Sequence, residues 1–387
     1  MIDLLAWGLA SPFLFLLAYL LVELVGGLGR LKPRAFGSSP EHIALLIPAH
    51  DEAASIADTV RALAAAAPTA HILVVADNCS DATAEQARAA GAETIERKDP
   101  ERRGKGFALA FGRNYLAGDP PDAVVVVDAD CRMERGSIER LAAAATATGA
   151  PVQASNLLVS SSDVPPLVAI SNFAMLVKNV VRARGLLRIG GGALLFGTGM
   201  AFPWPLFARL PLASANMVED LELGLELARE GVKIGFDDGA RVISPAASLA
   251  SGRGQRKRWE HGFLETARRQ VGPLLGAAVR RRSRHLAALG AHLLVPPLAL
   301  LLLAASLDLL LVAGLSLSGA DSAPALLLIA LLTLVGLTLL IAWWREARAL
   351  LPARDLLRAP LYLLWKLPLY LTFFTRRQTD WNRTRRD

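Results

Sequence analysis

Two pairs of acidic residues have a spacing that could do chemistry. Asp128 and Asp130 stand two residues apart after a run of valines, where their carboxylates could ligate Mg²⁺ or Mn²⁺ and, through the ion, a diphosphate. Glu219 and Asp220 open a stretch of leucines and acids, and Asp220 could take a proton from an attacking hydroxyl as a general base. The alternatives are turn-forming aspartates that cap a strand, and acids that a helix dipole stabilises.

A third group is cationic and aromatic. Gln255, Arg258 and Trp259 lie three and four positions apart, so they share one face if the segment is helical. The guanidinium of Arg258 could stabilise a leaving diphosphate, and the indole of Trp259 could stack on a sugar ring. The alternative is a basic amphipathic surface next to lipid.

Lys105 lies in the run Arg-Arg-Gly-Lys-Gly, which lacks the full pattern of a Walker A loop. Lys105 could contact a phosphate, or it could be a solvated surface lysine.

The elements that must position these residues alternate between strands and helices. Apolar runs predict strands over residues 43–47, 72–75 and 124–127, and alanine-rich stretches predict helices over 53–67 and 84–90. This alternation indicates right-handed βαβ units and a parallel sheet that is buried on both faces. Ligands of such sheets bind beyond the carboxyl ends of the strands.

Carboxylates follow all three predicted strands. They occur within the segments 48–52, 77–81 and 128–130. Carboxylates gathered at one edge repel each other, so a divalent cation would relieve the repulsion. The segment after the first strand has no GxGxxG pattern, which argues against a dinucleotide oxidoreductase.

The composition points to a membrane protein. The 387-residue chain is 53% hydrophobic and carries a net charge of +7. Its basic residues flank apolar segments, as they do on the cytoplasmic side of membrane spans, and aromatic residues do not interleave with them. Nucleic-acid binding is therefore not expected. Cys79 and Cys131 have no metal-binding spacing, and we expect two reduced thiols.

Three segments are long and apolar enough to cross a bilayer: residues 4–26, 292–313 and 323–344. The linker 314–322 has no Lys or Arg, so the positive-inside rule places it and the N-terminus outside, and the polar middle of the chain in the cytoplasm. The first segment lacks a basic leader and a cleavage site, which predicts an uncleaved anchor. The segment 359–374 has basic flanks at both ends and favours an interfacial or re-entrant helix over a crossing.

Together these patterns resemble the membrane-embedded glycosyltransferases of family 2, which include cellulose, chitin and hyaluronan synthases, bacterial exopolysaccharide enzymes and ceramide glucosyltransferase. The family's QxxRW motif is intact at Gln255, Arg258 and Trp259. Its opening motif corresponds to residues 47–52, and its nucleotide loop corresponds to residues 76–81. The resemblance covers roughly residues 43–262.

The resemblance implies an α/β GT-A fold with a Rossmann-like mixed sheet, a nucleotide-diphosphate sugar donor linked to UDP or GDP, and inversion at the anomeric carbon. The expected nucleotide-binding residues are Pro48, Glu52, Asp77, Asp128 and Lys105, of which Lys105 is expected from its own position in the sequence. Asp128 and Asp130 would form the metal-binding DxD with Mg²⁺ or Mn²⁺. Asp220, with Glu219, would be catalytic. The residues expected near the acceptor and diphosphate are Gln255, Arg258, Trp259, Gly197 and Thr198.

The resemblance also predicts the domain organisation. We expect an N-terminal transmembrane anchor (1–28), a cytoplasmic GT-A domain (40–262), an interfacial basic helix region (263–285), a C-terminal membrane region (286–375) and a basic cytoplasmic tail (376–387). The predicted location is a bacterial inner membrane.

Two departures from the polymer synthases bear on the acceptor. Val218 replaces the threonine of their TED motif, and no FxVTxK-type sequence follows Trp259. With about three spans, the sequence favours transfer to a lipid or lipid-linked saccharide in glycolipid or cell-surface polysaccharide synthesis. The alternatives are a processive exopolysaccharide synthase that acts as an oligomer or with a partner, and a non-catalytic membrane scaffold.

Overall fold

The computed structural model describes residues 1–34, 36–159, 164–214, 216, 218–245 and 249–375. The basic tail predicted over 376–387 lies outside them. The described chain forms two compact units. We call them the sheet unit (residues 30–159 and 192–255) and the helical unit (residues 1–29, 164–191 and 256–375), and each is described by itself.

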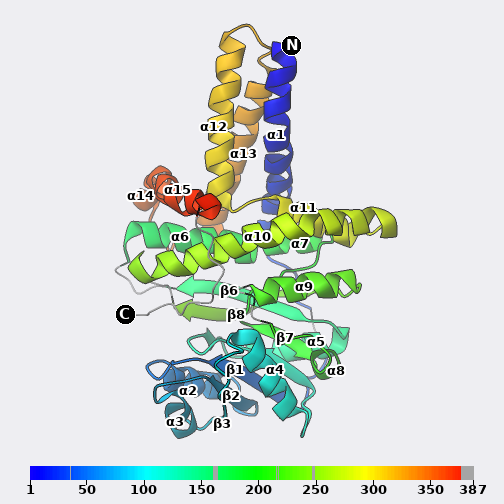
Figure 1. Cartoon of the computed structure of the whole chain (residues 1–387), viewed down its shortest axis with the longest axis vertical. Helices are drawn as coiled ribbons and strands as arrows, with labels where there is room; N and C mark the ends of the chain where they lie inside the picture. Colours follow the sequence, from blue (N-terminus) through cyan, green and yellow to red (C-terminus); the bar gives the residue numbers. More distant parts are fainter. Residues whose placement is uncertain (35, 160–163, 215, 217, 246–248, 376–387) are drawn as a thin grey trace. The chain divides into compact units, whose positions relative to one another are not determined.

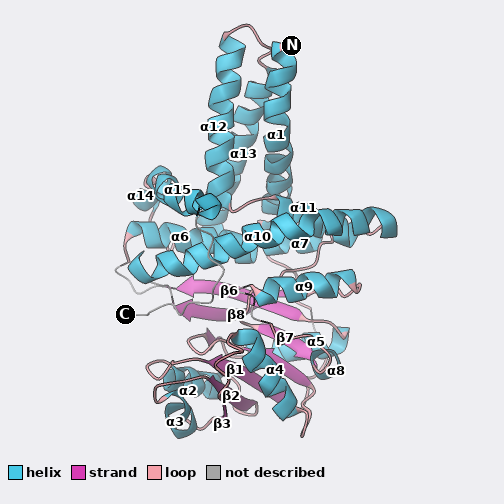
Figure 2. Ribbon diagram, viewed as in Figure 1, coloured by secondary structure: helices cyan, strands magenta, loops and turns pink. Residues whose placement is uncertain are grey.

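The sheet unit is built on one eight-stranded mixed sheet of the described residues, in the order β3-β2-β1-β4-β7-β6-β8-β5 (Figure 2). The strands are β1 (Ile43–Ala49), β2 (His71–Asp77), β3 (Glu93–Arg97), β4 (Ala123–Val126), β5 (Arg132–Met133), β6 (Val152–Val159), β7 (Met200–Pro203) and β8 (Gly235–Pro245). β3, β2, β1 and β4 are parallel, and β7 runs antiparallel between β4 and β6. This is a GT-A fold, as predicted, and the three predicted strands are β1, β2 and β4.

Helices cover both faces of this sheet. They are α2 (Ile56–Ala66), α3 (Thr83–Ala89), α4 (Lys105–Leu116), α5 (Ser137–Thr148), α8 (Trp204–Phe207) and α9 (Glu219–Arg229). Leu45 of β1 packs in one core with α2 and α5, whereas Leu46 faces Gly112 of α4 on the opposite side. A Cβ on Gly112 would lie 2.4 Å from Leu46 Cδ1, so a larger residue there would displace the buried Leu46 side chain.

The helical unit contains three helices that are long and apolar enough to cross a membrane: α1 (Ile2–Gly27), α12 (Leu298–Leu317), and α13 (Ala323–Ala342) with its continuation η2 (Trp343–Ala347) (Figure 1). The other helices are α6 (Pro166–Leu176), η1 (Val177–Arg182), α7 (Ala183–Arg188), α11 (Arg284–Leu294), α14 (Ala353–Leu356) and α15 (Ala359–Thr375). α10 (Leu249–Arg281) belongs to this unit from residue 256 onward.

The second apolar helix begins later than the sequence predicts. The expected span started at His292, but the structure places His292 on α11, and α12 starts only at Leu298. Pro296 and Pro297 separate the two helices, because proline has no N–H and disfavours helical backbone in the preceding residue. Asp308 lies on α12 and is buried.

The segment 359–374 is helical and forms most of α15. Tyr362 and Tyr370 of this helix share an apolar cluster with Ile170 of α6 and Ala299 of α12. Its expected position at the membrane interface remains a prediction.

A buried ionic cluster joins α1 to η1 and α11. The carboxylate of Glu23 accepts from Arg182 Nε at 2.7 Å, and its other oxygen lies 2.5 Å from His292 Nδ1. All three side chains are at most 6% exposed. The helices touch through glycines beside this cluster, because a Cβ on Gly185 would lie 2.0 Å from the Glu23 carbonyl oxygen. Glu23 is the one buried charged residue of α1, and it holds that helix against η1 and α11.

We predict that Glu23→Gln lowers the free energy of unfolding by about 3–5 kcal/mol, because Arg182 would stay buried without a carboxylate. The measurement is thermal or denaturant unfolding of the detergent-solubilised protein. Glu265→Gln is the control, since Glu265 pairs with the exposed Arg268 and its loss should cost less than about 1 kcal/mol. Equal destabilisation by the two substitutions would contradict this role of Glu23.

Candidate functional site

The first three predicted strands end at one edge of the sheet. The register pairs Ala49 with Ala76 and Leu46 with Val126, so β1, β2 and β4 point their carboxyl ends in the same direction. Open α/β sheets bind ligands beyond this edge. The loops after these strands therefore supply the candidate site.

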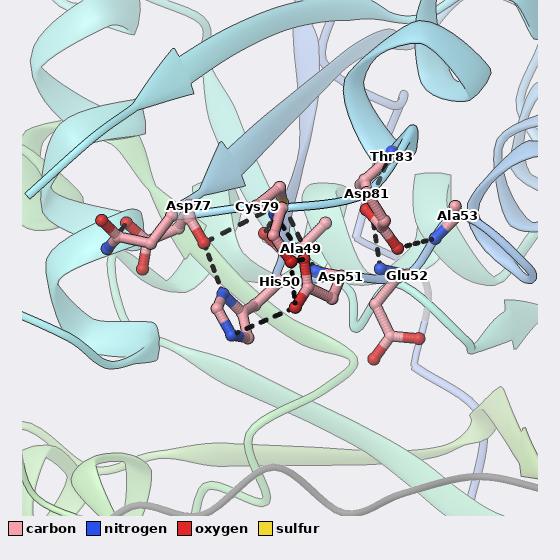
Figure 3. A network of polar contacts seen from close by, with 11 residues as sticks. Ala49, His50, Asp51, Glu52, Ala53, Asp77, Cys79, Asp81 and Thr83 are labelled. Carbon is pink, nitrogen blue, oxygen red and sulfur yellow. Dashed lines mark hydrogen bonds and ion pairs between the residues drawn. The ribbon is translucent and has the colours of Figure 1, made fainter. Parts of the chain in front are cut away.

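The loops after β1 and β2 are held to each other by a hydrogen-bond network (Figure 3). The carboxylate of Asp51 accepts from the Ser80 N–H at 2.6 Å, and that of Asp81 accepts from the Ala53 N–H at 3.1 Å. Asp51, Cys79 and Asp81 bring potential metal ligands close together, but burial raises the pKa of the Cys79 thiol above its ordinary value. Backbone donors thus already compensate these carboxylates, so this cluster does not require a cation.

Asp77 is also compensated within the protein. It lies at the end of β2, opposite Arg97 of β3 in the register, and Arg97 Nη1 donates to Asp77 Oδ1 at 2.6 Å. Arg97 reaches Asp99 at 2.9 Å as well. The sequence reasoning missed Arg97, and its only signal was a basic residue that ends a short strand. Contact of Asp77 with a nucleotide remains a prediction.

The sequence-predicted residues that the structure brings together surround Lys105. Lys105, the first residue of α4, forms an ion pair with Asp128 and donates from Nζ to the Gly197 carbonyl at 2.6 Å. The Asp128 N–H donates to Thr198 Oγ1 at 3.1 Å. Burial alone would lower the pKa of Lys105, but the nearby carboxylates, Asp128 first, raise it above its ordinary value. Lys105 is therefore a permanent cation of the site.

Glu219 and Asp220 begin α9 and face the same lysine. Gly197 has φ +83°, and a Cβ there would lie 3.3 Å from Asp220 Oδ2 and 3.4 Å from Lys105 Nζ. Burial, and next the charge of Asp220, raise the pKa of Glu219 to about 7. The lining of an adjoining pocket includes both acids and Met200. The two acids and the lysine therefore share one small volume.

Asp128 and Asp130 fit a divalent cation. Their oxygens and the Cys131 sulfur lie within 4.8 Å of one another. Burial raises the pKa of Cys131 well above its ordinary value, so the neutral thiol is a poor ligand and the two carboxylates are the usable donors. Carboxylate oxygens are the ligands that Mg²⁺ and Mn²⁺ prefer.

Gln153 organises the loop that carries Gly197 and Thr198. This fully buried side chain on β6 donates from Nε2 to the Thr198 carbonyl at 2.9 Å and accepts at Oε1 from the Phe196 N–H at 2.9 Å. It thereby fixes the loop residues that contact Lys105 and Asp128. The sequence reasoning missed Gln153, and the available signal was only a glutamine between the apolar residues Val152 and Ala154.

The remaining expected residues lie on β1, in the loop after it, and on α10. Pro48 is within β1, and Glu52 Oε2 accepts from Ser55 Oγ at 3.0 Å. Gln255, Arg258 and Trp259 are helical, on α10, but the boundary between the units falls directly after Gln255. Their proximity to Asp220 therefore remains a prediction.

Comparisons with known proteins agree with this geometry. Residues 40–284 match the sequence model of a family described as glycosyltransferase like family 2. The mannosyltransferase PcManGT from Pyrobaculum calidifontis, solved in complex with GDP-Man and Mn²⁺, shares the fold with 17% identity and a TM-score of 0.56, over 95% of this chain and 98% of that one. No curated protein matches the chain by sequence.

Glucosyl-3-phosphoglycerate synthase from Mycobacterium tuberculosis, in complex with Mn²⁺, UDP and phosphoglyceric acid, has 21% identity over 61% of this chain and 84% of that one. Its TM-score is 0.41.

We predict that Gln153→Leu destabilises the sheet unit by about 1–3 kcal/mol, because the Phe196 N–H and Thr198 carbonyl would be buried without partners. Amide hydrogen exchange at Phe196 should accelerate, and the melting temperature should fall. Gln86→Leu is the control. Gln86 is exposed on α3, so its substitution should change neither measurement. Unchanged exchange at Phe196 in the Gln153 variant would refute its role.

Proposed function

Because the chain belongs to glycosyltransferase-like family 2 and is a nucleotide-sugar glycosyltransferase of that type, we propose that it transfers a sugar, with inversion, to a membrane-held acceptor. The observation that carries the proposal is the grouping of Asp128, Lys105, Gly197 and Asp220 at the carboxyl edge of the sheet. This grouping occurs in a chain with three helices that are apolar enough to cross a membrane.

On the donor side, Asp128 and Asp130 would hold Mg²⁺ or Mn²⁺. When bound, the ion neutralises charge on the diphosphate of the donor and on the leaving group. Lys105 adds a fixed positive charge next to Asp128. We assign the nucleoside of a UDP- or GDP-linked donor to the loops of Pro48, Glu52 and Asp77. The Pyrobaculum mannosyltransferase, solved in complex with GDP-Man and Mn²⁺, supports this class of donor.

On the acceptor side, Asp220 is the general base. The acceptor oxygen attacks the anomeric carbon from the face opposite the diphosphate, the bond from that carbon to the diphosphate oxygen breaks, and the acceptor proton passes to Asp220. One displacement of this kind inverts the anomeric configuration. The raised pKa of Glu219 makes it a neighbour that can share this proton near neutral pH.

The acceptor and the leaving diphosphate would contact the loop of Gly197 and Thr198 together with Gln255, Arg258 and Trp259. In this assignment Arg258 stabilises the negative charge that develops on the diphosphate, and Trp259 provides a stacking face for a sugar. Gly197 leaves space beside Asp220 that any larger residue would fill.

We propose a lipid or lipid-linked saccharide as the acceptor, and a catalytic domain on the cytoplasmic face of a bacterial-type inner membrane. The basic flanks of the apolar helices and the 314–322 linker, which has no Lys or Arg, support this orientation. Three apolar helices in the described part of the chain, and Val218 before the acid pair, favour single additions over extrusion of a polymer. Product length separates these two outcomes.

Asp220→Asn should reduce transfer by about 10²–10⁴-fold while donor binding is retained, because the substitution removes the base and preserves the shape of the side chain. The assay is mass analysis of products from purified protein, native lipid extract and a panel of nucleotide sugars, with donor binding measured by calorimetry. Glu230→Gln, at the far end of α9, should leave transfer unchanged. Undiminished turnover in the Asp220 variant would overturn the assignment.

Removal of divalent ions with a chelator should abolish transfer, and added Mg²⁺ or Mn²⁺ should restore it. Asp130→Asn should raise the metal concentration needed for half-maximal transfer by about tenfold or more, because one of two carboxylate ligands is lost. Asp81→Asn alters the other carboxylate cluster and should leave that concentration unchanged. If the Asp81 variant shifts the metal requirement and the Asp130 variant does not, the ion has been assigned to the wrong cluster.

A further inference from the structure

An ion pair joins α10, the helix that carries Arg258, to α15. Glu260, two residues after Arg258, pairs with Lys366 of α15. Lys366 is only 3% exposed, so its charge is compensated inside the protein. The charge of the Glu260 carboxylate also acts on the phenol of Tyr370, on the same side of the contact. Glu260 is therefore the centre of the polar contacts between these two helices.

Two neighbouring side chains of α10 make further contacts with α15 and α6. His261 Nε2 donates to the Leu369 carbonyl at 2.9 Å, and its ring meets the Phe373 ring edge-on at 5.3 Å between centres. Arg256 Nε donates to Ser171 Oγ of α6 at 2.8 Å. The residues on either side of Arg258 thus anchor this part of α10.

The anchoring contacts fix the rotation of α10 about its axis. Each residue turns an α-helix by about 100°, and Arg258 is two residues from both Arg256 and Glu260, so it projects from the opposite face. Burial agrees with this, because Arg256 and His261 are buried whereas Arg258 is half-buried. The direction of the Arg258 guanidinium therefore depends on which face of α10 is held against α15.

The charge of Lys366 can be removed without leaving Glu260 uncompensated. Arg256 lies one helical turn from Glu260, whose charge already acts on it. Arg256 Nη1 and Glu260 Oε2 have no hydrogen-bond partner among the described residues. Without Lys366, Arg256 can therefore pair with Glu260, which avoids the cost of a buried unpaired carboxylate. That pair would lie within α10 and would no longer join the helix to α15.

We propose that Lys366 of α15 is a positioning residue for the transfer reaction, which acts through Glu260 to hold the Arg258 guanidinium in the direction of the leaving diphosphate. The proposal rests on the function proposed above, in which Arg258 stabilises that diphosphate. Lys366 itself touches no substrate. A misplacement of about 1 Å can cost about 10²-fold in rate, so a small rotation of α10 is enough to reduce transfer.

A double-mutant cycle on the full-length protein tests the proposal. Transfer is measured with native lipid extract and the nucleotide sugar of the panel that the unmodified protein uses. Lys366→Met should lower kcat by about 10- to 100-fold and change the KM of the donor by less than about twofold. Lys366→Arg, which keeps the ion pair, should retain most of the activity. In an Arg258→Ala background, Lys366→Met should have no further effect, because residues that act as a unit are not additive.

Glu265→Gln is the matched control. It breaks the pair of Glu265 with Arg268, both members of which belong to α10, and should leave kcat unchanged. If Lys366→Met lowers kcat by the same factor with and without Arg258, Lys366 acts on the fold alone and the proposal is wrong. If Arg258→Ala itself does not lower transfer, the proposed function is wrong at Arg258, and this proposal is wrong with it.

Amide hydrogen exchange of peptides that cover residues 256–261 gives a second measurement, which needs no substrate. Exchange there should be faster in Lys366→Met than in the unmodified protein, and unchanged in Glu265→Gln. Unchanged exchange in Lys366→Met would overturn the proposal whether or not a nucleotide sugar supports transfer. Should Lys366→Met not fold, Lys366→Gln is put through both measurements and decided by the same criteria.

Discussion

The positive charge of Lys105 is the interaction on which the sheet unit's site depends. Asp128, Glu219 and Asp220 come from two distant segments of the chain, and three carboxylates in one small volume would repel each other. Lys105 lies among them, pairs directly with Asp128, and keeps its proton because of their charges. It compensates only part of their charge. Burial first, and then the charge of Asp220, raises the pKa of Glu219. The remaining negative charge is what a divalent ion on Asp128 and Asp130 would offset.

This charge arrangement requires close backbone approaches. Lys105 reaches the site because the next residue, Gly106, has no side chain: a Cβ there would lie 2.4 Å from the Leu212 carbonyl oxygen. Gly197 similarly leaves room between Lys105 and Asp220. The loop that carries Gly197 has no side chain at that position to hold it in place. The buried amide of Gln153 forms hydrogen bonds with the Phe196 N–H and the Thr198 carbonyl of this loop. Gln153 therefore helps to position the charged groups although it is not one of them.

The parts of the fold with a strong local signal could be predicted from the sequence. The apolar strands β1, β2 and β4 are present, and their shared direction brings residues 50–52, 77–81 and 128–130 to one edge. Arg97 and Gln153 could not be predicted, because their importance arises from partners on other strands. The predicted start of α12 was wrong for another reason. Hydropathy gives no clear boundary over residues 292–297, but the two prolines there interrupt the helix.

The two groups of buried charged residues in the helical unit are compensated in different ways. Glu23, Arg182 and His292 satisfy one another, so their cost of desolvation is offset within the fold and their effect is to fix how α1 docks. Arg256 interacts with a hydroxyl and an aromatic ring, and the charge of the Glu260 carboxylate, four residues further along α10, acts on it.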